Sequence, residues 1–133
     1  MIYLDTSVVL ARLFAEDRHP SPSFWSLRFV SSRLLAYEVM VRVHALAAMP
    51  ILKESVLLED AQQLIDRISL VELAPAVVSR ALEPFPSPVR TLDALHLATM
   101  VFLRANNQSI ELATYDSRLA SAAAVLGFPL ADV

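Results

Sequence analysis

The sequence predicts a single α/β domain over residues 1–133, built on a central, mostly parallel sheet of four to five strands. Three observations lead to this prediction. Short apolar runs alternate with stretches of helical composition along the whole chain, which is typical of a parallel sheet with helices on both faces. The first run, Ile2-Tyr3-Leu4, is apolar at every position, as in a strand buried on both sides. Proline-rich turns separate the elements, and no repeat or linker interrupts the chain.

In the first half of the chain, hydroxyl and proline residues mark the ends of the elements. Thr6 and Ser7 follow the first strand and are suited to cap a helix. The helix that ends before Pro50 is apolar on most sides, so it is expected to be buried or shared with a partner. The predicted strands are Ile2–Leu4 and Phe29–Ser32, and the predicted helices cover residues 7–14, 24–28, 34–49 and 54–68.

In the second half, Pro84, Pro86 and Pro88 predict an extended loop before a strongly apolar helix, which Thr91 is expected to cap. Gly127, the only glycine, stands where a helix needs a left-handed residue at its carboxyl end. The predicted strands cover residues 69–73 and 110–114, with a short edge strand in 128–133, and the predicted helices cover residues 75–81, 92–106 and 117–126.

The composition excludes several classes of site and argues against several classes of protein. There is no cysteine, which excludes disulfides, thiolate metal sites and cysteine nucleophiles. The net charge of −3 argues against a generally basic nucleic-acid binder, although ten of the eleven basic residues are arginines, which suit phosphate. No apolar stretch reaches the ~18 residues of a membrane span, and no signal peptide is recognisable, so a cytoplasmic protein without membrane contact is expected. The 56% hydrophobic content indicates surfaces covered by partners or by self-association.

Four acidic residues recur at junctions between elements: Asp5, Glu38, Asp93 and Asp116. Each has an ordinary structural explanation. Asp5 and Asp116 could cap the helices that follow them, Glu38 could face solvent, and Asp93 could stabilise the first turn of its helix through the macrodipole. Ligands of open α/β sheets, however, bind outside the carboxyl ends of the strands, where these junctions lie.

If the four carboxylates meet, they need a cation. Two unit charges ~4 Å apart repel by roughly 4 kcal/mol at an effective dielectric constant of about 20. Oxygen-only ligands favour Mg²⁺, with Mn²⁺ as an alternative. Such ions activate water and neutralise charge on a phosphodiester, so hydrolysis of RNA or DNA is the expected reaction.

Four segments carry a resemblance to a known family: Ile2-Tyr3-Leu4-Asp5-Thr6-Ser7-Val8, Ser32-Arg33-Leu34-Leu35-Ala36-Tyr37-Glu38-Val39, Thr91-Leu92-Asp93-Ala94-Leu95-His96-Leu97-Ala98 and Thr114-Tyr115-Asp116-Ser117-Arg118-Leu119. The sequence resembles PIN-domain ribonucleases, and more closely the VapC toxins of bacterial type II toxin–antitoxin systems. The match covers nearly the whole chain, and its first and third segments are the most specific. The proline-rich stretch before Asp93 is less typical.

This resemblance implies a three-layer α/β/α PIN-like fold and a Mg²⁺- or Mn²⁺-dependent endoribonuclease. It implies that Asp5, Glu38, Asp93 and Asp116 form the metal pocket, supported by the hydroxyl of Thr6 or Ser7 and by Thr114. It also implies an RNA substrate such as tRNA or rRNA, a cognate antitoxin as partner, and a homodimer or a toxin–antitoxin hetero-oligomer.

Other interpretations stay open. A catalytically inactive PIN-like binding module would use the apolar helix of residues 34–49 as a docking surface. A metal-dependent phosphatase would also place an aspartate after its first strand, but it would need a second one where Ser7 stands. His96 is interpreted as a buried or supporting residue rather than a ligand. Phe24 and Trp25 are expected to meet the antitoxin, and Arg12, Arg33, Arg90 and Arg118 are either phosphate ligands or ordinary surface residues.

Overall fold

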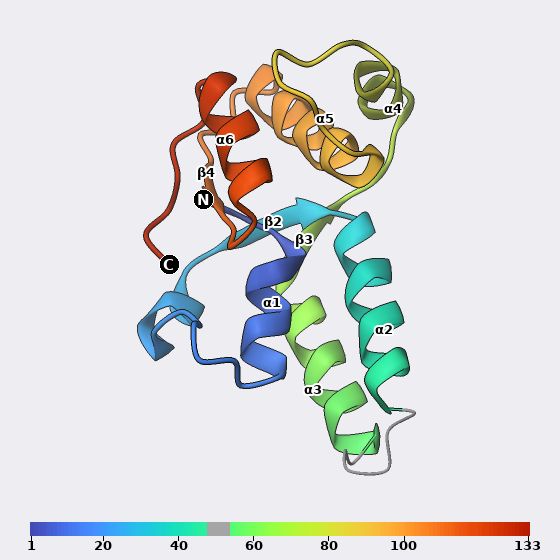
Figure 1. Cartoon of the computed structure of the whole chain (residues 1–133), viewed down its shortest axis with the longest axis vertical. Coiled ribbons are helices and arrows are strands. Elements are labelled where there is room, and N and C mark those ends of the chain that lie inside the picture. The colour runs from blue at the N-terminus through green and yellow to red at the C-terminus, as the bar shows by residue number, and fades with distance from the viewer. Residues whose placement is uncertain (48–53) are drawn as a thin grey trace.

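A four-stranded parallel sheet with the strand order β3-β2-β1-β4 forms the centre of the molecule (Figure 1). The structure is a computed structural model that describes residues 1–47 and 54–133. Its strands are β1 (Ile2–Leu4), β2 (Phe29–Ser32), β3 (Ile68–Val71) and β4 (Glu111–Ala113). Ile2 pairs with Phe29 on one side and with Glu111 on the other, so β1 is a central strand. The predicted mostly parallel α/β architecture is confirmed.

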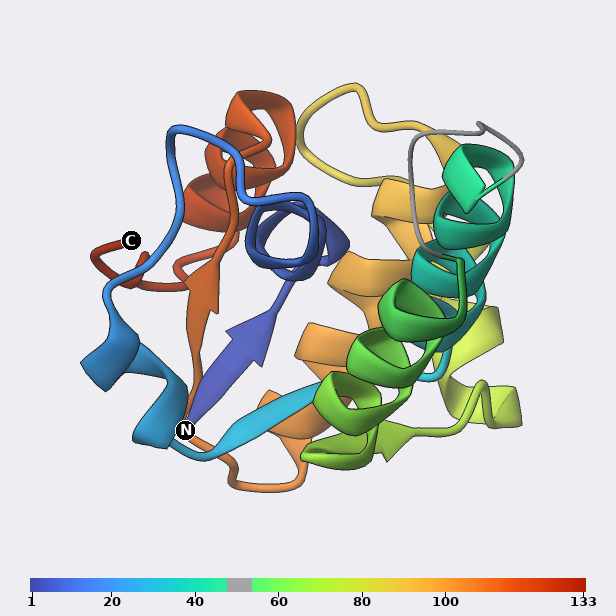
Figure 2. The same cartoon turned by 90° about the horizontal axis from the view of Figure 1, so that it is seen from below.

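Helices cover both faces of this sheet, as the sequence predicted, and give a three-layer α/β/α fold (Figures 1 and 2). One face carries α1 (Thr6–Leu13), α2 (Leu34–Ala47) and α3 (Glu54–Asp66), and the other carries α5 (Thr91–Ala105) and α6 (Ser117–Val125). The short helix α4 (Pro75–Ala81) packs on α5, and η1 (Pro22–Ser26) is a 3₁₀ helix that leads into β2. Within residues 1–47 and 54–133, the helices lack the length and hydropathy of a membrane span.

The alternation of side chains along β1 explains why its apolar run has no polar position. Ile2 and Leu4 belong to the core beneath α1, α2 and α3, whereas Tyr3 belongs to the core beneath α5 and α6. All three side chains are buried, because a central strand of a three-layer fold has no solvent face.

Several element boundaries differ from the sequence predictions. Ile68 pairs with Phe29 as the first residue of β3, so α3 ends at Asp66 rather than at 68. The segment 128–133 contributes only an isolated bridge between Leu112 and Leu130 instead of an edge strand. Arg90 rather than Thr91 is the N-cap of α5, because Asp93 accepts a hydrogen bond from the Arg90 backbone N–H at 3.3 Å. The predicted helix end at 49–50 lies outside the described residues.

The expectation that Phe24 and Trp25 meet a partner is wrong. Both side chains are buried, and their rings lie 5.3 and 5.6 Å from the ring of Phe29. This aromatic cluster closes the core at the amino end of β2, where apolar burial outweighs any use of these residues on the surface.

Gly127 ends α6 as predicted, with φ at +81°. The Phe128 N–H donates to the Ala123 carbonyl at 3.0 Å and the Gly127 N–H to the Ala124 carbonyl at 2.9 Å, which satisfies two carbonyls of the last turn. We expect Gly127→Ala to lower the free energy of unfolding by roughly 1–2 kcal/mol, because an L-residue is strained at this φ. Urea denaturation measures this loss, and an unchanged midpoint would contradict the assigned cap.

Candidate functional site

The four predicted acidic residues line one cavity of about 500 Å³ at the carboxyl edge of the sheet. Asp5 follows β1 directly, and Asp116 lies three residues after β4. The strands β1 and β4 are neighbours in the sheet (Figure 2). Glu38 lies in the second turn of α2, and Asp93 in the first turn of α5. Parallel strands end at the same edge, so residues more than a hundred positions apart in the sequence share this cavity.

Asp5 is 7% exposed and caps α1. Its Oδ2 accepts hydrogen bonds from the Ser7 N–H at 3.3 Å, the Ser7 hydroxyl at 2.5 Å and the Thr114 hydroxyl at 2.8 Å. The hydrogen bonds of the described residues leave its Oδ1 free. One carboxylate oxygen is therefore fixed by the protein, and the other is available to a ligand in the cavity.

The same two hydroxyls connect the loops that carry Asp5 and Asp116. The Ser7 hydroxyl accepts from the Tyr115 N–H at 3.0 Å, and the Thr114 hydroxyl accepts from the Asp116 N–H at 3.0 Å. Each hydroxyl donates to Asp5 while it accepts from the loop after β4. The separation of the two carboxylates is thus held by side-chain hydrogen bonds and does not depend on the sheet alone.

Glu38 is held by two donors on a single oxygen. Its Oε1 accepts from the Thr6 hydroxyl at 3.0 Å and from Nε2 of His96 at 2.7 Å. Because a carboxylate only accepts, His96 must carry a proton on Nε2. The hydrogen bonds of the described residues leave Oε2 of Glu38 free, so its position in the cavity is determined by the two bonds to Oε1.

His96 is buried and is anchored in turn by Tyr3. The Tyr3 hydroxyl lies 2.8 Å from Nδ1 of His96 and accepts from the Ser32 N–H at 3.2 Å. Burial raises the pKa of Tyr3 far above its ordinary value. Burial works against a charged His96, but the hydrogen bond to Glu38 and the charges of the nearby carboxylates outweigh it, so the pKa of His96 is raised. A continuous hydrogen-bonded chain therefore runs from the backbone of β2 to Glu38.

Asp93 and Asp116 share one cationic partner, Arg90. Its Nε lies 3.4 Å from Oδ2 of Asp93, and its Nη2 lies 3.2 Å from Oδ2 of Asp116. The other oxygen of Asp116 caps α6, because Oδ1 accepts from the N–H groups of Arg118 and Leu119 at 2.9 and 3.2 Å. These two carboxylates are thus arranged so that a single positive group can contact both.

The set of donors fits Mg²⁺ or Mn²⁺. All four acidic side chains offer carboxylate oxygen, which these hard cations prefer, and Asp93 and Asp116 already share a cation. In the described residues no group of three or more histidine, aspartate or glutamate side chains has a geometry that could hold a metal ion as it stands.

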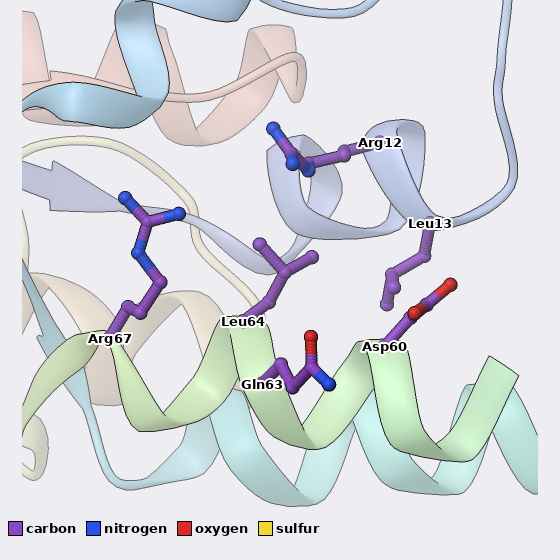
Figure 3. A pocket seen from close by; sticks show the side chains of 6 residues that line it. All are labelled: Arg12, Leu13, Asp60, Gln63, Leu64 and Arg67. Atoms are coloured by element: carbon purple, nitrogen blue, oxygen red, sulfur yellow. The ribbon is translucent and has the colours of Figure 1, made fainter. Parts of the chain in front are cut away.

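A smaller cavity of about 240 Å³ lies between α1 and α3 (Figure 3). Asp60 is among its lining residues, but none of the four acidic residues of the first cavity is. Arg12 and Arg67 are among its lining residues. The guanidinium of Arg12 lies 4.6 Å above the ring of Trp25, and Arg67 donates to the Trp25 carbonyl. Both arginines help to hold Trp25 in the core, and the candidate site is not located there.

The sequence indicates the four acidic residues but not the contacts among them. Its pattern does not distinguish whether Arg90 is a phosphate ligand or a surface residue, and it gives no role in the site to Tyr3. One signal was present for Tyr3: a buried tyrosine hydroxyl needs a polar partner, and Tyr3 stands in an otherwise apolar strand. The supporting position of His96 agrees with its interpretation from the sequence.

Comparison with known proteins assigns the chain to a family. The family model of the PIN domain matches residues 2–125. The chain is 27% identical over 133 residues to ribonuclease VapC47 of Mycobacterium tuberculosis (strain CDC 1551 / Oshkosh), over 99% of this chain and 96% of that protein. It is 31% identical over 132 residues to ribonuclease VapC35 of the same species, over 95% of this chain and 92% of that protein. The chain therefore belongs to the PIN domain family, as its sequence motifs indicated.

Proposed function

We propose that the protein is a divalent-metal-dependent endoribonuclease that acts as the toxin of a type II toxin–antitoxin system. The observation that carries this proposal is the convergence of Asp5, Glu38, Asp93 and Asp116 on one cavity at the carboxyl edge of the sheet. Membership of the PIN domain family and similarity to proteins named ribonucleases support it.

The proposed reaction is hydrolysis of an RNA phosphodiester. A bound Mg²⁺ or Mn²⁺ would lower the pKa of a water molecule and neutralise charge on the phosphate. Asp5, Asp93 and Asp116 would hold the ion, and Glu38 would complete the pocket. With Oε1 of Glu38 held by Thr6 and His96, Oε2 is the oxygen able to orient the attacking water and accept its proton. The water oxygen bonds to phosphorus, the bond to the adjoining ribose oxygen breaks, and the leaving oxygen takes up a proton.

The proposed partners are an RNA substrate such as tRNA or rRNA and a cognate antitoxin, with a homodimer as the expected state of the toxin. Exposed apolar side chains support such contacts. Tyr37 and Val41 on α2 are 64% and 70% exposed and lie one helical turn apart. A cytoplasmic location follows from this function, because the proposed substrates and the antitoxin are cytoplasmic molecules.

The test is cleavage of total RNA by the purified protein with Mn²⁺, with Mg²⁺ and with excess chelator. We expect discrete fragments with either ion and none with the chelator, because without a divalent ion no group in the cavity activates water, and the carboxylates that Arg90 does not contact repel the substrate. Mn²⁺ binding to the protein alone, measured by calorimetry, is the companion measurement. A protein that neither binds Mn²⁺ nor cuts RNA would be the inactive binding module instead.

A further inference from the structure

We propose that Arg90 is an internal counter-cation of the acidic cavity, which bridges Asp93 and Asp116 in the metal-free protein and is released by metal binding to contact an RNA phosphate. This inference rests on the proposed function. In its bridging state, the Arg90 guanidinium opposes metal binding. In its released state, the same guanidinium favours RNA binding.

The bridge joins the first turns of two helices. The guanidinium contacts Oδ2 of Asp93 at the start of α5 and Oδ2 of Asp116 at the start of α6, at 3.4 and 3.2 Å. Among the described residues that line this cavity, Arg90 is the only arginine or lysine, and four carboxylates line it with Arg90. In the absence of a metal ion, it supplies the positive charge that two neighbouring carboxylates require.

Metal binding competes directly with this bridge at Asp116. The Oδ1 of Asp116 is already engaged by two backbone N–H groups as the cap of α6, so Oδ2 is its oxygen for a cation in the cavity. The same Oδ2 holds Arg90. An ion that binds Asp116 through this oxygen brings a second positive charge against the guanidinium, and the repulsion between the two cations favours release of Arg90.

Release of Arg90 costs little. Its side chain is 63% exposed and that of Asp116 is 30% exposed, and solvent-exposed ion pairs contribute little to stability. Asp93, whose side chain is 10% exposed, keeps the hydrogen bond from the Arg90 N–H when the guanidinium leaves. Arg90 also lines a neighbouring cavity of about 640 Å³ between α4, the proline-rich loop and α5, which gives the guanidinium space beside the site. The backbone of Arg90 stays fixed as the cap of α5. A freed guanidinium therefore remains at the rim, where its planar fork fits the oxygens of a phosphate.

The test uses Arg90→Gln, with Arg42→Gln as the matched control. Arg42 lies one helical turn after Glu38 on α2, is exposed, and does not line the cavity, so the control removes the same charge near the site without removing the bridge. Two quantities are measured at one ionic strength: the Mn²⁺ dissociation constant without RNA by calorimetry, and KM and kcat for an RNA oligonucleotide at saturating Mn²⁺.

We expect Arg90→Gln to bind Mn²⁺ about two- to fivefold more tightly than the control, because the guanidinium no longer competes with Mn²⁺ for Asp116. The gain is small because exposed ion pairs are weak. We expect its KM for RNA to rise about tenfold or more, because a charge-assisted contact to phosphate is lost. Arg90→Lys keeps the charge without the planar fork and should lie between Arg90→Gln and the wild type in both measurements. If Arg90 had a purely structural role, Arg90→Gln would lower Mn²⁺ affinity and RNA cleavage together.

The possible outcomes distinguish the two parts of this proposal from each other and from the proposed function. Mn²⁺ affinity equal to that of Arg42→Gln would overturn the bridge, and an unchanged KM would overturn the phosphate contact. If Arg90→Gln loses both Mn²⁺ affinity and cleavage, Arg90 has only a structural role. A wild type that binds Mn²⁺ and cuts RNA, with Arg90→Gln behaving as the control does, overturns this inference alone. A wild type that does neither removes the proposed function with it.

Discussion

Asp5→Asn should reduce RNA cleavage by about 10²–10³-fold while leaving the protein folded. A bound metal ion contributes several kcal/mol to stabilisation of the transition state, and each 1.36 kcal/mol is a tenfold change in rate. Asparagine caps helices as well as aspartate does, and its carbonyl oxygen can accept the bonds now made by Ser7 and Thr114. The substitution therefore removes the charge that faces the cavity and keeps the local structure.

Cleavage rate at saturating Mn²⁺, Mn²⁺ affinity and the urea midpoint check this expectation together. Asp17→Asn is the matched control, because Asp17 is exposed in the loop after α1 and does not line the acidic cavity. If Asp5→Asn binds Mn²⁺ and cuts RNA at the wild-type rate, Asp5 is a helix cap and nothing more.

His96→Ala should affect both stability and turnover. It removes the Nε2 donor to Glu38 and leaves the Tyr3 hydroxyl facing a cavity, which we expect to lower the free energy of unfolding by about 2–4 kcal/mol. When a residue does not bind the metal itself but holds a metal ligand in position, its loss typically reduces activity or metal affinity by about 10–100-fold. His96→Gln retains a side-chain donor and should recover most of the turnover.

The control for this experiment separates lost positioning from lost stability. Leu103 lies about two helical turns beyond His96 on α5, is buried, and packs in the core beneath α5 and α6. Leu103→Ala should cost about 2–5 kcal/mol of stability without a contact to Glu38. At a temperature where all variants are folded, a kcat of His96→Ala equal to that of Leu103→Ala would show that His96 only fills the core.

Most of the fold was predictable because its signals are local. Each of these signals depends on a few neighbouring residues. Examples are the apolar run of β1, the proline-rich stretch before α5 and the left-handed position of Gly127. The errors arose where tertiary pairing decided the boundary. Ile68 fits the apolar face of α3 equally well, and only its pairing with Phe29 assigns it to β3. Phe24 and Trp25 could not be distinguished from a partner surface until Phe29 was seen against them.

The acidic residues were predictable individually for the same reason, since each stands at a junction between elements. Their relation to one another depends on distances across the fold. Glu38 and His96 are 58 positions apart, and Arg90 and Asp116 are 26 apart, so no local pattern links them. The role of Arg90 in particular follows from its contacts with two acidic residues, whereas its sequence position suggests only a basic residue before a helix.

The sequence by itself determined that this protein is an α/β domain of the PIN type with carboxylates at the ends of its strands and helices. That information lies in the hydrophobic period, the caps and the turn residues, which act over a few positions. The tertiary structure alone decided which oxygen of each carboxylate is fixed and which faces the cavity, and that Arg90 spans two of them. Those facts depend on the parallel alignment of β1 and β4 and on the packing of α5 and α6 above them, which bring distant side chains within hydrogen-bonding distance.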